Sequence, residues 1–245
     1  MEDKALLSTE EASGAEKAEL LIVIPAYNEA ENIERVVNHL TANFPQYDYV
    51  VVNDGSRDET AAICQRNGYN LLNLPVNLGL AGAFQAGLKY ADKYGYQYAV
   101  QLDGDGQHRP EYLESMIKKM EEGYDIVIGS RFVGEKKPFT MRMLGSNLIE
   151  LAIRFTTGVN IKDPTSGMRM FSKRMIREFA SGLNYGPEPD TISYLLKQGA
   201  RVAEVPVIMD ERILGVSYLT PVNAMRYMLK MLISILLIQN FRKRR

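Results

Sequence analysis

The chain has 245 residues, of which 46% are hydrophobic, enough for one large core or two tightly joined subdomains. Its formal net charge is −1, so the overall field gives no reason to expect nucleic acid as a partner. Cys64 is the only cysteine, which excludes an intramolecular disulfide and favours a reducing, cytoplasmic setting.

Charge is unevenly distributed along the chain. Residues 1–19 carry six acids against Lys4 and Lys17, with little apolar periodicity, so we expect a disordered acidic tail there. Residues 212–245 carry seven basic residues and no acid, which points to an anionic surface near this end. We expect no secretory signal, because the acidic N-terminus lacks its charged and apolar regions. We also expect no membrane span, because no apolar run reaches the roughly 18–20 residues that a bilayer requires.

Short runs rich in Val, Ile, Leu and Tyr alternate with segments of helical period, which predicts β–α repeats around a mainly parallel sheet. In chain order we expect strands at residues 20–24, 49–52, 71–74, 98–102 and 125–128, with helices at 29–40, at 57–66, after Gly79 and from Pro110. Beyond Arg131 we expect a lysine-bearing loop, a helix at 143–155, a strand at 168–171, a helix at 192–197 and a strand at 202–208. The fold class is therefore α/β.

Three predicted strands are followed by polar clusters: PAYNE (residues 25–29), NDGS (53–56) and DGDGQH (103–108). Any one cluster is explained by turn chemistry, because Pro, Asn, Asp and Gly are the residues of tight turns. In open α/β sheets, however, ligands bind beyond the carboxyl ends of the strands. The joint placement of the clusters therefore indicates a binding site.

Asp103 and Asp105 crowd like charge at the end of a strand, which is unfavourable unless a cation or hydrogen-bond donors compensate. A divalent metal is the simplest compensation. Mg²⁺ and Mn²⁺ prefer oxygen ligands and often take only one or two carboxylates, with water and substrate phosphate completing the shell. Gln107 can add a carbonyl oxygen. His108 could be a ligand too, but a surface histidine before Arg109 and Pro110 is more often solvated or helix-capping.

Together with NLGLAGAFQAG (77–87), these motifs resemble the family 2 glycosyltransferases of GT-A fold, and among them the dolichol- or polyprenyl-phosphate sugar synthases. The resemblance covers about residues 20–208. It implies a Rossmann-like, mostly parallel sheet flanked by helices, and an inverting transferase that uses a nucleotide-sugar donor with Mg²⁺ or Mn²⁺. Within a catalytic domain of residues 20–220, it implies a nucleotide-sugar-binding half at 20–131 and an acceptor-binding half at 132–220.

The resemblance also implies roles for single residues. Donor-binding positions correspond to Pro25, Tyr27, Glu29, Val52, Asp54, Gly79 and Asp103, although Gly79 is equally well explained as a helix-start glycine. The metal-binding pattern corresponds to Asp103, Asp105 and Gln107. Arg131 corresponds to a diphosphate contact that assists the catalytic Asp105, with an exposed surface arginine as the alternative. Acceptor-phosphate contacts correspond to Arg142 and Ser146, and Asp163 lies in DPTSG, which resembles the acceptor-phosphate turn incompletely.

The acceptor is left open by the sequence. A sugar hydroxyl needs a general base, whereas a lipid phosphate is already an anion and needs none. Glu188 and Asp190, just before a predicted helix, are both candidate catalytic bases. They are equally well explained as acids that the dipole at a helix N-terminus favours.

Residues 221–245 predict an amphipathic helix with a basic tail. Asn223, Arg226, Lys230 and Ser234 form a narrow polar stripe among Met, Leu and Ile, which suits a helix in the membrane interface. We therefore expect peripheral binding at the cytoplasmic face, close to a lipid-linked acceptor. The alternative is a helix packed on the catalytic domain or on a second copy, so a homo-oligomer stays open.

Other classes with related sheets fit less well. A sugar nucleotidyltransferase typically has a glycine-rich loop and a lysine after the first strand, and PAYNE has neither. A dehydrogenase would need GxGxxG at that point, which is absent. A non-catalytic, membrane-bound nucleotide-binding scaffold would be supported by an eroded metal cluster, whereas Asp103, Asp105 and Gln107 are all present.

Overall fold

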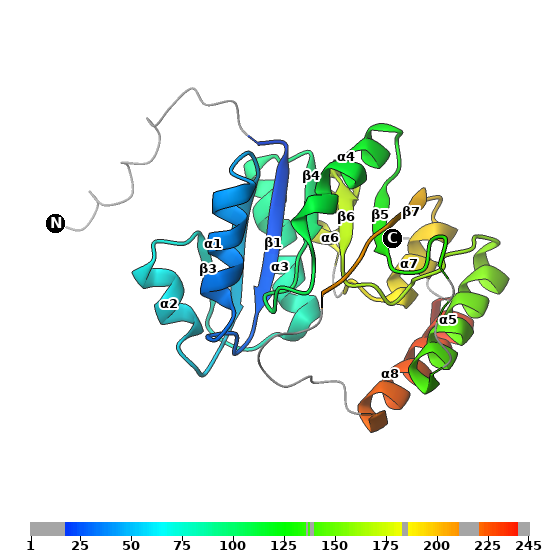
Figure 1. Ribbon diagram of the computed structural model, residues 1–245. Coiled ribbons are helices and arrows are strands. Elements are labelled where there is room, and N and C mark those ends of the chain that lie inside the picture. The colour runs from blue at the N-terminus through cyan, green and yellow to red at the C-terminus, as the bar shows by residue number, and fades with distance from the viewer. Residues whose placement is uncertain (1–17, 136, 138–139, 183–185, 211–220, 240–245) are drawn as a thin grey trace.

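The computed structural model describes residues 18–135, 137, 140–182, 186–210 and 221–239, so most of the expected acidic tail lies outside the described residues. Within them, a seven-stranded sheet carries helices on both faces (Figure 1). The strands are β1 (Leu20–Ala26), β2 (Asp48–Asp54), β3 (Leu71–Leu74), β4 (Tyr98–Gln101), β5 (Ile126–Ser130), β6 (Arg169–Ser172) and β7 (Val202–Pro206). Their order across the sheet is β3-β2-β1-β4-β6-β5-β7, and only β6 runs antiparallel to its neighbours. The predicted α/β class is confirmed.

The helices are α1 (Ile33–Asn43), α2 (Thr60–Arg66), α3 (Gly79–Tyr94), α4 (Leu113–Glu121), α5 (Met141–Thr157), α6 (Lys173–Ser181), α7 (Pro189–Lys197) and α8 (Pro221–Ile233). A 3₁₀ turn (η1, Pro110–Tyr112) precedes α4, and a π-helical turn (η2, Ser234–Ile238) continues α8. Helix α1 starts four residues later than predicted, because residues 29–32 form a turn closed by the Asn32 N–H on the Glu29 carbonyl. Helix α6 was not predicted.

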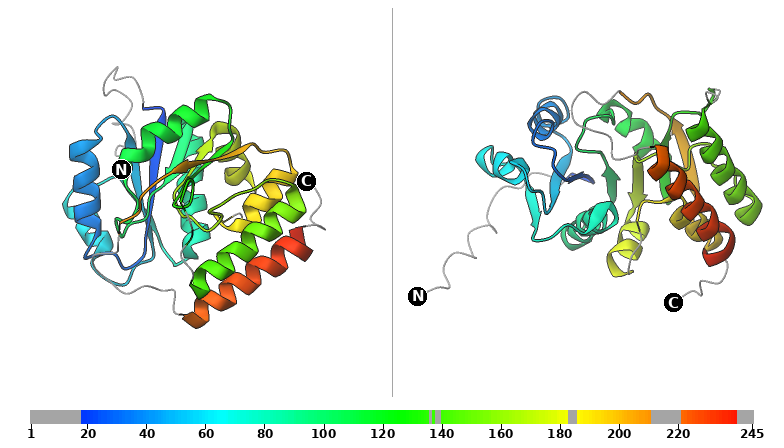
Figure 2. Two further views of the ribbon diagram at one scale, coloured as in Figure 1. Left: turned by 45° about the vertical axis from the view of Figure 1, so that its right-hand side comes forward. Right: turned by 90° about the horizontal axis from the view of Figure 1, so that it is seen from below.

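Alternate residues of β1 face the two cores of the molecule. Leu21 and Val23 point into a core shared with α3, α5, α6, α7 and α8, whereas Ile22 and Ile24 point into one shared with α1, α2 and α4. All four side chains are fully buried, and Figure 2 shows helices on either side of the sheet. This continuous burial is typical of a central parallel strand covered on both faces.

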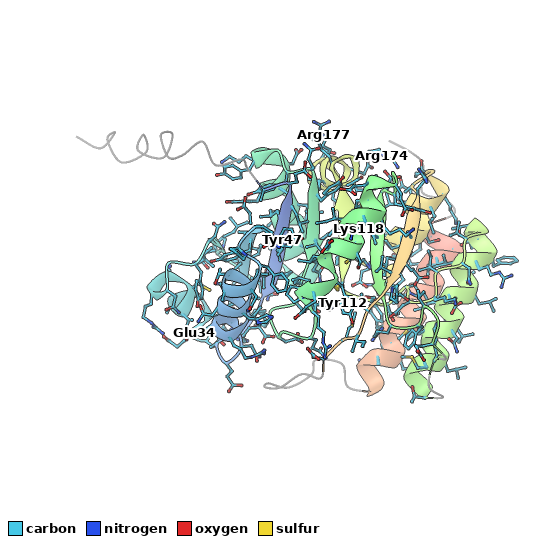
Figure 3. The ribbon with its side chains drawn as sticks, turned by 45° about the horizontal axis from the view of Figure 1, so that its top comes forward. Glu34, Tyr47, Tyr112, Lys118, Arg174 and Arg177 are labelled. Atoms are coloured by element: carbon cyan, nitrogen blue, oxygen red, sulfur yellow. The ribbon has the colours of Figure 1, made fainter. Side chains whose placement is uncertain are left out.

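Helix α6 begins with a side-chain cap and is fixed at the sheet by an ion pair. The Ser172 hydroxyl accepts the Met175 N–H, a standard N-cap. Arg174, which is labelled in Figure 3, donates to Asp125 at 2.8 and 2.6 Å. Burial alone would raise the pKa of Asp125, but Arg174 and the Arg201 N–H hold this pKa below its ordinary value. The pair thus joins α6 to the start of β5.

The order of the strands places the candidate site. The chain leaves β1 toward β2 and β3 on one side, while β4 lies on the other, so the loops after β1 and β4 meet at the topological switch point. A Cβ added to Gly104 would lie 3.1 Å from the Pro25 carbonyl oxygen, which shows how closely the two loops approach. The predicted convergence of the PAYNE and DGDGQH segments is therefore observed.

Helices α5 and α8 lie side by side at the far edge of the domain, as both Figures 1 and 2 show. Gly145 of α5 packs against Met228 of α8, because a Cβ at Gly145 would lie 2.8 Å from the Met228 Cγ atom. Among the described residues no helix is long and apolar enough to cross a membrane.

A substitution at Gly87 tests how closely α3 packs against β1. A Cβ at Gly87 would lie 2.2 Å from Val23 Cγ1 inside the core, so Gly87→Ala is expected to destabilise the protein by ~1–3 kcal/mol through overpacking. Gly145→Ala is the matched control, since it meets a flexible methionine. Urea unfolding of both variants would measure the difference, and equal stabilities would contradict this packing.

Candidate active site

The loops after β1 and β2 are joined by side-chain hydrogen bonds. The Asn28 N–H donates to Ser56 Oγ at 3.0 Å, and Asn28 Oδ1 accepts the Arg57 N–H at 2.9 Å. Asn28 has φ 56, a left-handed conformation that asparagine tolerates better than most residues. The Glu29 N–H donates to Thr60 Oγ1 at 2.9 Å. The predicted donor-binding residues of PAYNE thus sit in a fixed loop, with Tyr27 43% exposed.

Asp54, at the end of β2, holds the segment that leads into α3. Its Oδ1 atom accepts the Leu78 N–H at 2.7 Å, and Asn77 Nδ2 donates to its carbonyl at 3.0 Å. Asp54 is 3% exposed, and the neighbouring Val52 is fully buried. Gly79 has φ 74 with open space around it, so backbone conformation alone already favours glycine there. The structure therefore brings Asp54 and Gly79 together at the start of α3.

Asp103 and Asp105 lie in the turn that follows β4, at the tip of the sheet. Asp103 Oδ1 accepts from Gln101 Nε2 at 2.9 Å, and Asp105 Oδ1 accepts the Gln107 N–H at 3.0 Å. The side chain of Asp103 is 37% exposed, so its carboxylate keeps an open side. Asp105 is 9% exposed as a residue. The two carboxylates are thus held by donors from the end of β4 and from the turn itself.

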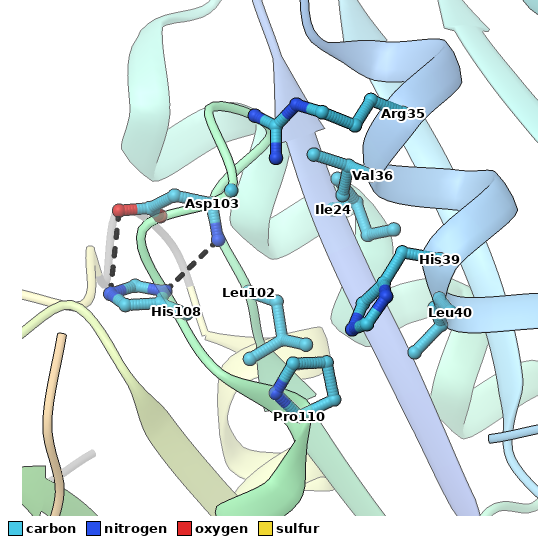
Figure 4. A pocket seen from close by; sticks show the side chains of 10 residues that line it. Ile24, Arg35, Val36, His39, Leu40, Leu102, Asp103, His108 and Pro110 are labelled. Atoms are coloured by element: carbon cyan, nitrogen blue, oxygen red, sulfur yellow. Dashed lines mark hydrogen bonds and ion pairs between the residues drawn. The ribbon is translucent and has the colours of Figure 1, made fainter. Parts of the chain in front are cut away.

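Helix α1 supports this turn through Arg35. Arg35 Nη2 donates to the Asp105 carbonyl at 3.0 Å and to Asn32 Oδ1 at 3.3 Å. A small pocket lies between α1 and the turn, lined by both basic and apolar side chains (Figure 4): Ile24, Arg35, Val36, His39, Leu40, Leu102, Asp103, Gly106, His108 and Pro110. Arg35 thus connects the metal-binding turn predicted from the sequence to the helix after PAYNE.

Gln107 and Arg109 join the turn to the segment after β7. Gln107 Nε2 donates to the Asp210 carbonyl at 3.1 Å, and the Asp210 N–H donates back to the Gln107 carbonyl at 3.0 Å. Arg109 pairs with the Asp210 carboxylate, with Nε at 2.8 Å, and this hydrogen bonding lowers the pKa of Asp210. Because its amide nitrogen is engaged, the side-chain oxygen is the ligand atom that Gln107 can offer. Sequence reasoning missed Arg35 and Asp210, which lie far from the motif along the chain.

Arg131 and Asp163, which the sequence placed in separate roles, form one unit. Arg131 Nε and Nη2 donate to the two Asp163 oxygens at 2.7 and 2.8 Å, and the Arg131 N–H donates to the same carboxylate at 3.1 Å. The Asp163 side chain is 0% exposed, whereas the Arg131 side chain is 26% exposed. Asp163 is therefore placed to orient Arg131.

The other predicted acceptor residues lie on α5. Arg142 is in its first turn, with a side chain outside the described part of the structure, and Ser146 is fully buried one turn later. The buried Arg169, at the start of β6, donates to the Pro164 carbonyl at 2.6 Å, and burial lowers the pKa of its guanidinium. Arg169, which the sequence did not single out, thus holds the DPTSG turn in place.

Glu188 and Asp190, the candidate bases, contact the C-terminal helix. The Tyr227 hydroxyl donates to Glu188, while Ser234 Oγ and Gln239 Nε2 donate to Asp190 Oδ2 at 2.6 and 3.2 Å. Burial raises the pKa of Tyr227 above its ordinary value, and the neighbouring Glu188 adds to this rise. Ser234, the last residue of the predicted polar stripe, is 5% exposed and packs on the catalytic domain. The two acids fasten α8 and η2 to α7.

The side chains of the turn after β4 bear on which metal this turn could hold. Within the described residues, no group of three or more His, Cys, Asp or Glu side chains is arranged as a metal-holding cluster. Asp103 and Asp105 provide two carboxylates, and Mg²⁺ and Mn²⁺ sites often take one or two carboxylates that water and substrate phosphate complete. Structural zinc sites, by contrast, take four protein ligands.

Comparison with known proteins places the chain in a family. Residues 21–180 match the family described as Glycosyl transferase family 2. The chain is 31% identical to the polyprenol monophosphomannose synthase of Mycolicibacterium smegmatis, with 86% of this chain and 84% of that protein covered. It is also 31% identical to the undecaprenyl-phosphate mannosyltransferase of Micrococcus luteus, with 81% and 86% covered.

A solved structure gives the same fold. Glucosyl-3-phosphoglycerate synthase from Mycobacterium tuberculosis, in complex with Mn²⁺, UDP and glucosyl-3-phosphoglycerate, superimposes with a TM-score of 0.63 at 20% identity, covering 90% of this chain and 79% of that one. The GT-A fold predicted from the motifs is confirmed. The chain belongs to glycosyltransferase family 2 and is a glycosyltransferase that resembles the polyprenyl-phosphate sugar synthases.

Gly106 provides a test of the turn at the tip of β4. Its φ is 79, and an added Cβ would lie 2.8 Å from the Arg35 guanidinium, so Gly106→Ala is expected to cost ~1–3 kcal/mol of unfolding free energy. Gly68→Ala is the control, with a φ of 65 but open space. Chemical denaturation would compare them. A control that is as destabilised as Gly106→Ala would show that Arg35 does not constrain the turn.

Proposed function

We propose that the protein is an inverting, metal-dependent glycosyltransferase that moves a sugar from a UDP-, GDP- or dTDP-linked donor to a polyprenyl phosphate or a lipid-linked saccharide. The observation that carries the proposal is the pair of carboxylates, Asp103 and Asp105, in the turn after β4. The names of two relatives, a polyprenol monophosphomannose synthase and an undecaprenyl-phosphate mannosyltransferase, support the lipid phosphate acceptor.

A divalent metal fits the residues of this turn. Asp103, Asp105 and the side-chain oxygen of Gln107 would hold Mg²⁺ or Mn²⁺, as hard oxygen donors on one short turn. Bound there, the metal would supply positive charge to the leaving nucleoside diphosphate. Mn²⁺ in the solved relative with UDP supports this assignment.

The donor would lie against the loops after β1 and β2. Pro25, Tyr27 and Glu29 form the fixed loop beside Gly104, and Tyr27 keeps enough exposure to contact a base. Val52 and Asp54 lie at the end of the neighbouring strand, and Gly79 begins α3. Together these residues would bind the nucleotide and orient the anomeric carbon toward the acceptor side.

Arg131 would stabilise negative charge between the donor and the acceptor. Asp163 holds the guanidinium by two hydrogen bonds, which fixes the direction of its remaining N–H groups before substrate binds. Arg142 and Ser146, in the first two turns of α5, are proposed as acceptor contacts.

The contacts of Glu188 and Asp190 favour a phosphate acceptor over a saccharide hydroxyl. Both carboxylates accept hydrogen bonds from residues of α8 and η2. These hydrogen bonds give both acids a structural role, the attachment of α8 and η2 to α7. A phosphate monoester attacks without a base, so the reaction is compatible with acids that are engaged in this way.

Replacing one carboxylate tests the catalytic role. Asp105→Asn keeps the shape of the side chain and removes its charge, so sugar transfer should fall about a hundredfold or more, with unfolding stability nearly unchanged. Asp92→Asn, near the far end of α3, is the control and should retain activity. Transfer would be measured with UDP-, GDP- and dTDP-sugars and with polyprenyl phosphate or a lipid-linked saccharide, in Mn²⁺ and in EDTA.

The outcomes of that panel separate the candidate classes. A sugar lipid formed only with metal supports the proposal, whereas activity of Asp105→Asn near the wild-type level would contradict it. Pyrophosphate release from a nucleoside triphosphate and a sugar phosphate would indicate a nucleotidyltransferase. No turnover with any donor would indicate a scaffold.

The apolar face of α5 and α8 suits a membrane surface on the cytoplasmic side. Several large apolar side chains on these helices and η2 are exposed: Leu144, Leu148, Leu151, Phe155, Met225, Leu229, Ile233, Leu236, Leu237 and Ile238. Phe155 is the most exposed of them, at 83%. A group of exposed apolar side chains on one face of a protein typically marks an interaction site. Arg226 and Lys230 on α8 are also exposed, as expected near anionic head groups.

Charges on this face should weaken binding to vesicles. Each apolar side chain that enters the interface contributes ~1.5 kcal/mol or more, so the double variant Leu151→Asp, Phe155→Asp should bind anionic vesicles about tenfold more weakly or worse. Tyr94→Asp, on an exposed apolar residue of α3, is the control. Co-sedimentation with vesicles of anionic phospholipid would measure both. Unchanged sedimentation of the double variant would remove α5 from the membrane-binding surface.

A further inference from the structure

His108 is buried beneath the metal-binding turn, which corrects the expectation of a solvated or helix-capping histidine. Its side chain is 3% exposed. Its Nδ1 atom accepts the Asp103 N–H at 3.0 Å, and its Nε2 atom lies 3.6 Å from Asp103 Oδ2 (Figure 4). Because Nδ1 accepts a hydrogen bond, the neutral ring carries its proton on Nε2, the nitrogen that faces the carboxylate.

The DPTSG segment packs against the imidazole and the Asp103 carboxylate through Gly167. A Cβ added to Gly167 would lie 3.1 Å from His108 Cε1 and 3.3 Å from Asp103 Oδ2. Both distances are tighter than ordinary van der Waals contact, so a larger residue would push on the ring and on the carboxylate together. The absence of a side chain at Gly167 thus leaves room for the contact between His108 and Asp103.

Asp103 is consequently held from three directions. His108 Nδ1 fixes its backbone N–H, the Nε2 atom faces one carboxylate oxygen, and Gln101 donates to the other. The carboxylate nevertheless keeps 37% of its side-chain exposure, so it is oriented without being covered. The same contacts leave His108 no free lone pair for a metal, since Nδ1 is engaged and Nε2 is protonated.

We propose that His108 is a positioning residue, not a metal ligand: it sets the direction of the Asp103 carboxylate toward the metal and the donor diphosphate. The inference rests on the proposed function, because it concerns the same turn. Groups that hold metal ligands in place typically change metal affinity or activity by about 10- to 100-fold when they are removed. His108 contacts both the N–H and the carboxylate of Asp103, so its removal should weaken metal binding.

Two substitutions separate the contacts of His108 from its bulk. His108→Leu removes both nitrogens, whereas His108→Asn places an amide oxygen near the Nδ1 position and keeps an acceptor for the Asp103 N–H. His39→Leu is the matched control, because His39 lines the same pocket from α1 and its side chain is 50% exposed. Thermal unfolding would show that each variant is folded.

The first readout needs neither metal nor activity. The chain has only two histidines, so selective ¹⁵N-histidine labelling gives two rings to assign, and His39→Leu identifies the His108 signal. We expect the neutral His108 ring as the Nε2–H tautomer in metal-free protein. An Nδ1–H tautomer would overturn the inference, since Nδ1 would then be unable to accept from Asp103.

The second readout is the dissociation constant of Mn²⁺, measured by calorimetry with saturating UDP or GDP, whichever the wild-type chain binds. We expect His108→Leu to weaken Mn²⁺ binding about tenfold or more, His108→Asn to keep affinity within about threefold of wild type, and His39→Leu to match wild type. Wild-type affinity in His108→Leu would overturn the inference alone, and so would equal losses in His108→Leu and His108→Asn. A wild-type chain that binds no Mn²⁺ with either nucleotide would overturn the proposed metal site and this inference together.

Discussion

Two carboxylates on one short turn repel each other, and the turn after β4 is built to hold them in place. The Asp103 carboxylate is fixed by Gln101 and faced by His108, and Asp105 accepts the Gln107 N–H. Arg35 brings a cation from α1 to the Asp105 carbonyl. These donors reduce the repulsion without covering Asp103, so that a divalent cation remains the natural partner of the open side.

The rest of the molecule is arranged around this turn. The loops after β1 and β2 are fixed to each other through Asn28 and Ser56, and Asp54 holds the start of α3. On the other side, Asp163 orients Arg131, while α7 holds α8 through Glu188 and Asp190. Helix α8, which is proposed to face the membrane together with α5, is thus joined by part-buried hydrogen bonds to the half of the domain that is proposed to bind the acceptor.

The sequence predicted the parts of the fold that depend on short-range patterns. Strand and helix periods gave the α/β class, and the rule for open sheets brought PAYNE, NDGS and DGDGQH to one edge. Helix α6 was overlooked although Ser172 and the buried Met175, Ile176 and Phe179 carry a cap and a helical period. That signal was available, and it would have corrected the prediction.

The sequence pattern could not predict contacts between residues that lie far apart along the chain. Arg131 and Asp163 are 32 positions apart, and each fitted a substrate contact on its own. Ser234 continued the polar period of α8, but its partner Asp190 is visible only once α7 and η2 are packed. His108 was taken for a surface residue because no local pattern reveals that Gly167 and Asp103 enclose it. In each case tertiary contact decides a role that composition leaves open.

The most direct test of the account is a crystal grown with Mn²⁺ and the nucleoside diphosphate that binds best, examined at the manganese absorption edge. The account predicts an anomalous peak beside the Asp105 carboxylate at the end of β4, bridging to the diphosphate, with the base against the loops after β1 and β2. A peak and a nucleotide seated elsewhere, with the carboxylates of this turn free of metal, would contradict it.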